Sequence, residues 1–157
     1  MIHITVISVG KLKEQYWKDA EKEYLKRLSV FVKLEIKELK EEKFDEKSNH
    51  ETIKEKEAEK ITKAIPENSH VIALDKDGRQ YSSHDLSDHL QQLEQLQHYN
   101  ITIVIGGPLG LSDEIKHLAK ESISFSQMTF THQMTRIILL EQIYRSCMIQ
   151  KGKTYHY

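Results

Sequence analysis

The chain has 157 residues, which suits one compact domain over residues 1–157, and a formal net charge of −1, which excludes a globally basic nucleic-acid-binding chain. Its one cysteine, Cys147, excludes an intrachain disulfide and fits a reducing compartment. No apolar run reaches the roughly 18 residues that cross a membrane and no signal peptide precedes the first strand pattern, so we expect a cytoplasmic protein with no membrane partner.

The N-terminal part of the chain alternates between strand and helix patterns. Residues Ile2–Val9 are β-branched and alternate in polarity, which predicts a strand that ends at Gly10. Apolar side chains at helical spacing predict a helix over Lys13–Leu28, and a second alternation predicts a strand over Val30–Leu39. The segment Lys40–Asn49 is dense in charge, has almost nothing to bury and is expected to form a surface loop.

A mostly charged helix is expected next. Ser48-Asn-His-Glu51 resembles a capping box, which predicts a helix to about Ala64, and Pro66 closes the connection. The continuous apolar run His70–Leu74 predicts a strand buried on both faces, and Asp75-Lys-Asp-Gly78 predicts a turn after it.

The rest of the chain repeats this alternation. The expected elements are a helix opened by the capping box Ser82-Ser-His-Asp85 and carrying Leu86, Leu90, Leu93 and Leu96, a buried strand over Ile101–Ile105, a helix from the N-cap Ser112 to about Glu121, a short strand over Ile123–Phe125, and a long helix over about His132–Gln150. Strands separated by helices predict an α/β fold with a mostly parallel sheet flanked by helices.

Three segments follow consecutive buried strands, where ligands bind in open α/β sheets: Leu74–Gly78, Gly106–Leu111 and Phe125–Thr131. Gly106 and Gly107 allow the backbone to approach a ligand without a Cβ clash. The same Gly-Gly-Pro-x-Gly pattern is equally typical of a tight strand-to-helix turn, so it does not identify a ligand.

The usual signatures of other site classes are missing from the sequence. There is no Gly-x-Gly-x-x-Gly after the first strand, no Walker A loop and no Gly-x-Ser-x-Gly elbow. The nine histidines contain no His-Glu-x-x-His, and no Cys-x-x-Cys occurs, so no metal partner is expected. These patterns leave a nucleotide-like binding domain whose reaction is open.

Several ordered segments together resemble one family. They are Val6–Lys13, Glu23–Arg27, Val104–Leu111, Ser124–Phe130, His132–Arg136, Leu140–Arg145 and Tyr155-His156. The chain resembles, over essentially its whole length, the ribosomal large-subunit pseudouridine N3-methyltransferases, a minimal branch of the SPOUT superfamily. The resemblance implies that the C-terminal segment is threaded into a trefoil knot, which no general rule of chain topology would predict.

The resemblance also implies a cofactor, S-adenosyl-L-methionine, in a pocket built from the three loops. The residues expected to line it are Leu74, Gly106, Phe125, Ser126, Gln127, Met128, Thr129 and Phe130. Leu74 and Phe130 are also typical of ordinary core positions, and the two interpretations are compatible.

The implied reaction is methyl transfer to N3 of pseudouridine 1915 in 23S rRNA of the large subunit, in assembled ribosomes. The candidates for removing the N3 proton or stabilising the deprotonated ring are His132, Arg136 and His156. The expected substrate-binding residues are Arg145, Lys153 and Tyr155. In the family two subunits build the site, so a homodimer is expected, with the helix Met134–Met148 as its contact surface.

Two positions depart from the family pattern. Thr131 stands where the family usually has proline, and a threonine is able to cap the following helix. Tyr157 stands where the family usually has a basic residue, which motivates two alternatives. One is a divergent knotted methyltransferase that acts on another RNA, such as tRNA, and the other is a catalytically silent paralogue that only binds S-adenosylmethionine.

Overall fold

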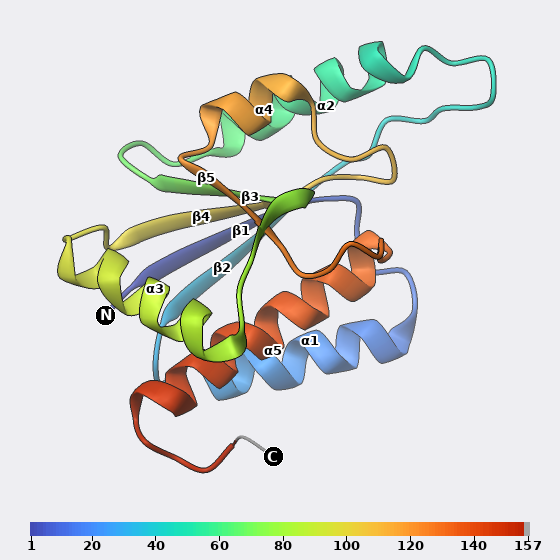
Figure 1. Cartoon of the computed structure of the whole chain (residues 1–157). Coiled ribbons are helices and arrows are strands. Elements are labelled where there is room, and N and C mark those ends of the chain that lie inside the picture. Colours follow the sequence, from blue (N-terminus) through green and yellow to red (C-terminus); the bar gives the residue numbers. More distant parts are fainter. Residues whose placement is uncertain (156–157) are drawn as a thin grey trace.

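The computed structural model describes residues 1–155, which form one five-stranded sheet with helices on both of its faces (Figure 1). In chain order the elements are β1 (His3–Val9), α1 (Gln15–Leu28), β2 (Lys33–Leu39), α2 (His50–Ala64), β3 (His70–Gln80), α3 (Ser83–Gln95), β4 (Asn100–Ile105), α4 (Asp113–Leu118), β5 (Glu121–Ser124) and α5 (His132–Gln150). The strand order is β2-β1-β4-β3-β5, and every pairing is parallel. The predicted α/β class is confirmed.

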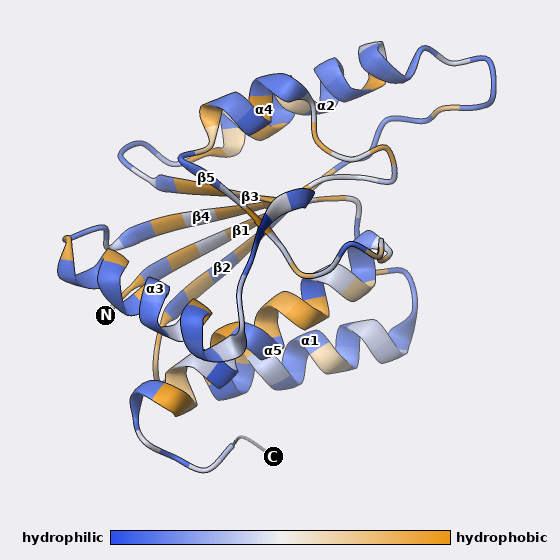
Figure 2. Cartoon of the chain, in the orientation of Figure 1, coloured by the Kyte–Doolittle hydropathy of each residue, from blue (hydrophilic) through white to orange (hydrophobic). Residues whose placement is uncertain are grey.

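Two apolar layers hold the helices to the sheet. Helices α1, α3 and α5 cover one face, while α2 and α4 cover the other (Figure 1). The strands are rich in hydrophobic residues, whereas α2 is largely hydrophilic (Figure 2). Each fully buried Val, Leu or Ile side chain contributes roughly 1.5–3 kcal/mol, so the strands and the helix faces packed on them stabilise the fold together. No helix among residues 1–155 is long and apolar enough to cross a bilayer.

Hydroxyl side chains cap three helices as predicted. Ser82 forms the capping box with Asp85 at the start of α3. Ser112 Oγ accepts a hydrogen bond from the Ile115 backbone N–H over 3.3 Å, and Thr131 Oγ1 accepts one from the Met134 N–H over 3.3 Å. Thr131 is therefore the N-cap of α5.

The predicted capping box at Ser48 is wrong. The N-cap of α2 is Asn49, whose Oδ1 accepts hydrogen bonds from the N–H groups of Glu51 and Thr52 over 3.0 and 3.3 Å. Ser48 Oγ instead accepts one from the Asp45 N–H over 2.9 Å and so closes the preceding turn. The two signals stand side by side in the sequence, and the asparagine prevails because it reaches two free helix donors.

The end of β3 also differs from the prediction. The strand continues through the expected turn at Asp75–Gly78 and reaches Gln80, with a shift in register between Leu74 and Arg79. A Cβ at Gly78 would lie 2.7 Å from backbone atoms of Ile123, so glycine permits β3 to lie this close to β5. Helix α4 ends at Leu118, earlier than the predicted end at about Glu121, because β5 already begins at Glu121.

Candidate functional site

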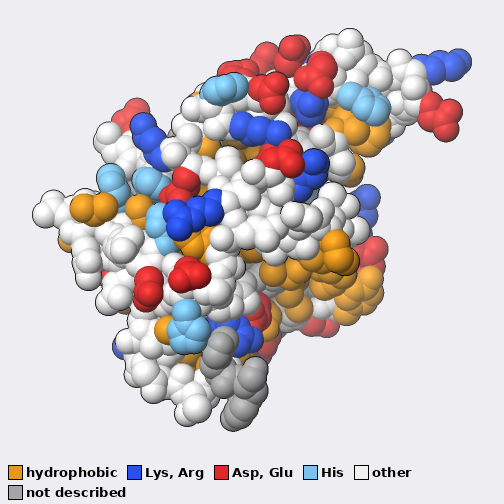
Figure 3. Space-filling model, in the orientation of Figure 1, with side chains coloured by type: hydrophobic (Ala, Val, Ile, Leu, Met, Phe, Trp, Pro, Cys, Tyr) orange, Lys and Arg blue, Asp and Glu red, His pale blue; other side chains and the backbone are white. Residues whose placement is uncertain are grey.

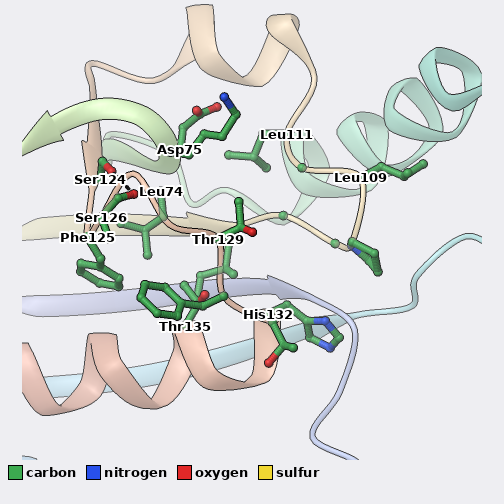
Figure 4. Close-up of a pocket in the computed structure, with 18 of the residues that line it drawn as sticks. Leu74, Asp75, Leu109, Leu111, Ser124, Phe125, Ser126, Thr129, His132 and Thr135 are labelled. Atoms are coloured by element: carbon green, nitrogen blue, oxygen red, sulfur yellow. Dashed lines mark hydrogen bonds between the residues drawn. The ribbon is translucent and has the colours of Figure 1, made fainter.

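A cavity of about 740 Å³ opens beyond the carboxyl ends of the central strands. Its walls come from residues 74–76 within β3, from the segments that follow β4 and β5, and from the first turn of α5 (Figure 4). This volume lies within the range of about 300–1,000 Å³ that is typical of small-molecule sites. The three segments predicted from the strand pattern therefore meet around one space, although the first of them is strand rather than loop.

The glycine loop after β4 forms one wall. A Cβ at Gly106 would lie 2.8 Å from the carbonyl carbon of Gly110, so only glycine fits there. Gly110 has φ +80°, and its N–H donates to the Gly107 carbonyl over 2.9 Å. The loop is thus a tight turn and a cavity wall at once, so the two interpretations of the motif hold together.

The loop after β5 forms the opposite wall. Ser124 Oγ donates to the Ser126 carbonyl over 2.9 Å, and Ser126 Oγ accepts from the Met128 N–H over 3.0 Å, which fixes the turn. The predicted donor-binding residues that line the cavity are Leu74, Gly106, Phe125, Ser126, Met128, Thr129 and Phe130. Gln127 belongs to the same loop and is not among the lining residues.

His132 stands at the start of α5 and closes the cavity on the side of β1 (Figure 4). A Cβ at Gly10 would lie 2.8 Å from His132 Nε2, and Gly10 has φ +91°, so glycine is required there twice over. Nε2 is buried and has no hydrogen-bond partner among the described residues. Burial lowers the pKa of this imidazole, although Glu41 and the Lys11 backbone act in the opposite direction. The ring is therefore neutral at pH 7.

The far end of the cavity is charged. Asp75 Oδ2 and Lys116 Nζ are 2.6 Å apart, and both residues line the cavity. Burial alone would raise the pKa of Asp75, but the Lys116 ammonium and the Asp77 N–H outweigh it and leave the pKa below its ordinary value. The same contact raises the pKa of Lys116. This end carries a fixed ion pair, whereas the loop after β5 contributes the apolar side chains of Phe125, Met128 and Phe130.

Comparisons with known proteins agree with this geometry. Residues 2–156 match the family model described as "Predicted SPOUT methyltransferase". The chain belongs to the SPOUT methyltransferase family. It is 47% identical to "Ribosomal RNA large subunit methyltransferase H" of Clostridium acetobutylicum over 99% of both chains. A protein of the same name in Bacillus thuringiensis subsp. konkukian is 45% identical, again over 99% of both chains.

In this SPOUT methyltransferase the three expected substrate-binding residues lie far from the cavity. Arg145, Lys153 and Tyr155 belong to the C-terminal end of α5 and the segment after it, whereas the cavity lies at the N-terminal end (Figure 1). The nineteen residues of α5 span roughly 28 Å at about 1.5 Å per residue. Arg145 Nη2 lies 2.6 Å from Glu141 Oε1, and the guanidinium carbon lies 4.9 Å from the centre of the Tyr155 ring.

Arg136, expected to act on the substrate, lies in the protein interior rather than in the cavity. Its side chain is fully buried, does not line the cavity, and pairs with Glu38 on β2 and Glu21 on α1. Arg136 lies one turn further along the same face of α5 than His132, and at that depth the neighbouring groups are Glu21 of α1 and Glu38 of β2 rather than the cavity. His156, the third predicted catalytic residue, lies outside the described residues.

Exposed apolar side chains occur on the loop after β5, at the start of α5 and at the start of α1. Met128, Phe130 and Met134 are 70%, 38% and 37% exposed, and Tyr16 at the start of α1 is 62% exposed. Hydrophobic side chains gather over this part of the molecule, where the loop after β5 and the start of α1 lie (Figure 3). By contrast, Leu139, Leu140, Ile143 and Met148 of α5 are buried within the chain's own core.

The sequence does not indicate the Asp75–Lys116 pair, because Asp75 stands in a segment with a turn pattern and Lys116 belongs to a distant element, α4. The available signal was the position of Asp75 directly after a buried strand, where polar side chains face the ligand edge of the sheet. Among residues 1–155, no group of three or more His, Cys, Asp or Glu side chains is placed to hold a metal ion.

Proposed function

We propose that this protein transfers a methyl group from S-adenosylmethionine to N3 of a pseudouridine in large-subunit rRNA. The observation that carries the proposal is the cavity formed by β3 and the loops after β4 and β5 in a chain whose full-length relatives bear the name of a large-subunit rRNA methyltransferase. The family's trefoil knot and a cytoplasmic location belong to the same proposal.

The cavity suits the proposed donor in size and in the character of its walls. Gly106 brings backbone close to the space, and Leu74, Met128 and Phe130 offer apolar contact to an adenine ring. Backbone groups of Phe125–Phe130 would bind the adenine and ribose, with Gln127 contributing through its main chain. When bound, the donor supplies an electrophilic methyl group on a sulfonium, so the chain mainly has to orient the acceptor, an effect worth about 7–11 kcal/mol.

His132 is proposed to position the donor rather than to take the proton. Its Nε2 faces Gly10, and the burial that lowers its pKa keeps a neutral ring beside a cationic ligand. Arg136 is likewise proposed as a positioning residue, because it links α5 to β2 and α1. Removal of the N3 proton is then assigned to His156 in the tail, the remaining candidate.

A homodimer is proposed because one chain does not bring the tail and the cavity together. The tail begins at the end of α5 that is remote from the cavity, so a second copy would have to supply Arg145, Lys153, Tyr155 and His156. The exposed apolar surface formed by Met128, Phe130, Met134 and Tyr16 is the proposed contact region, centred on the start of α5. Arg145 and Lys153 would then contact rRNA phosphates beside the partner's cavity.

The proposal is tested by incubating the purified protein with labelled S-adenosylmethionine and ribosomes from cells that lack the gene. We expect label in large-subunit rRNA, located at N3 of a pseudouridine by mass spectrometry of the digested nucleosides. Ribosomes that already carry the modification are the control and should accept no label.

Two outcomes would replace the proposal. Label in tRNA, with none in ribosomes, would identify a knotted methyltransferase with another RNA substrate. Calorimetric binding of the donor without turnover on either RNA would identify a silent binding protein.

A further inference from the structure

One end of the cavity carries charge of both signs. Lys54, Lys76 and Lys116 line the cavity, and the Nζ atom of each lies within 3.1 Å of a carboxylate oxygen. Among the described lining residues, Asp75 is the only acid. Because every lysine is paired, this end has little excess positive charge for a polyanion such as an RNA backbone.

The pair of Asp75 with Lys116 is the most enclosed of the three. The two side chains are 9% and 34% exposed, compared with 72% and 60% for Asp77 and Lys76. Asp75 Oδ1 also accepts the Asp77 N–H over 2.9 Å, so the carboxylate is held on both oxygens. Each oxygen keeps a second lone pair, and an ammonium has three N–H donors, so both groups retain capacity for a ligand.

We infer that Asp75 and Lys116 form the subsite for the amino-acid end of the methyl donor. Asp75 accepts hydrogen bonds from the α-ammonium of the donor, and Lys116 donates to its α-carboxylate. The inference rests on the proposed function, because it requires that the cavity holds S-adenosylmethionine.

Charge complementarity supports this ligand over a phosphate. The amino-acid end is a zwitterion with one charge of each sign, which matches a fixed acid beside a fixed base. The two parts of the donor would thus bind in different parts of the cavity. Apolar side chains of the loop after β5 would contact the adenine. The ion pair, which would bind the amino-acid end, lies on the other side of the cavity from His132 (Figure 4).

The test compares two ligands by isothermal titration calorimetry. S-Adenosylhomocysteine and methylthioadenosine share the adenosine and a neutral thioether, but only the first carries the amino-acid end. The wild-type protein should bind S-adenosylhomocysteine at least about tenfold more tightly. Asp75→Asn should reduce this preference to roughly twofold or less while the Kd for methylthioadenosine stays within about twofold of the wild-type value.

Two further variants keep the test independent of folding. Lys116→Gln should also reduce the preference, because it removes the partner of the carboxylate. Asp77→Asn, which changes an exposed acid two positions away, should leave the preference unchanged.

Three results would overturn the inference. The first is no preference in the wild-type protein, and the second is an equal loss of both ligands in Asp75→Asn, which would make the pair a purely structural contact. The third is a wild-type preference that survives in both Asp75→Asn and Lys116→Gln. Failure of the wild-type protein to bind either ligand would instead remove the proposed function itself.

Discussion

Both terminal nitrogens of Arg136 donate hydrogen bonds to one carboxylate oxygen of Glu38, each over 2.8 Å, although the residues are 98 positions apart in the sequence. Glu21 Oε2 lies 3.2 Å from Nη1 on the other side. Burial raises the pKa of Glu21, and Arg136 opposes that rise. The buried guanidinium therefore links α5, which begins at the cavity, to β2 and α1.

We expect Arg136→Met to lower the free energy of unfolding by about 3 kcal/mol, because it leaves two carboxylates without their partner. Urea denaturation followed by circular dichroism measures the change. The control is Arg27→Ala, which breaks an exposed pair with Glu23 at i,i+4 and should cost less than about 1 kcal/mol. Equal effects of the two substitutions would contradict the structural role assigned to Arg136.

A second prediction concerns Gly10. Gly10→Ala places a Cβ against His132 Nε2 at a backbone conformation of φ +91°, so the imidazole has to move. We expect donor affinity to fall at least about tenfold, measured by calorimetry. Gly152→Ala is the matched control, because its φ of +61° imposes backbone strain while no atom lies within 4 Å of the added Cβ. If Gly10→Ala left the Kd for the donor unchanged, His132 would not be part of the donor-binding site.

The lowered pKa of His132 predicts a pH dependence. Because the folded-state pKa lies below the unfolded value of 6.5, the unfolded chain takes up the proton first. The stability contribution is therefore fully present above pH 6.5 and is lost as pH falls through the folded-state pKa. Protonation also places a cation beside the sulfonium, so donor affinity should fall over the same range.

Histidine NMR measures this titration directly. The His132 resonance should titrate below the value for an ordinary imidazole, and His132→Gln should remove the acid-side loss of both stability and donor affinity. A His132 resonance that titrates at or above the ordinary value would contradict the prediction.

Much of the fold was predictable because the buried strands have recognisable local sequence patterns. Apolar β-branched runs identify β1 and β4 within a residue of their observed starts, whereas the prediction of a turn at Asp75–Gly78 is wrong, because β3 continues there beside β5. There the strand at Asp75–Gly78 is polar, and it is held by an edge pairing that depends on Gly78 fitting against Ile123. A contact between distant segments leaves no local pattern, so the sequence predicts a turn.

In the candidate site, too, the features set by local sequence were predictable and those set by contacts between distant segments were not. The glycine loop and the loop after β5 were predictable from their place after buried strands, since chain order alone puts them at one edge of the sheet. The environments of the Arg136 and Asp75 side chains were not predictable, because each side chain pairs with a residue of another element. Arg136 pairs with Glu38 on β2, and Asp75 pairs with Lys116 on α4. Helical spacing predicts which side chains share a face but not which charge faces them.

The proposed sharing of the site between two copies predicts complementation between inactive variants. Gly106→Val blocks the cavity, since even a Cβ there lies 2.8 Å from backbone, whereas the double substitution Tyr155→Ala and His156→Ala removes the tail groups. Each variant alone should be inactive in the ribosome methylation assay. When the two variants are mixed in equal amounts and exchange subunits, half of the dimers contain one copy of each variant.

Each mixed dimer then contains one site with an intact cavity and an intact tail, because these come from different copies. Activity should recover to about a quarter of the wild-type value, as one of the two sites works in half of the dimers. Mixing Gly106→Val with a second cavity variant outside the proposed contact region, Leu74→Trp, is the control and should restore nothing. If the first mixture stays inactive while exchange is demonstrated by mass spectrometry of the intact dimers, each site is built from a single chain, and the tail must cross the length of α5 to reach its own cavity.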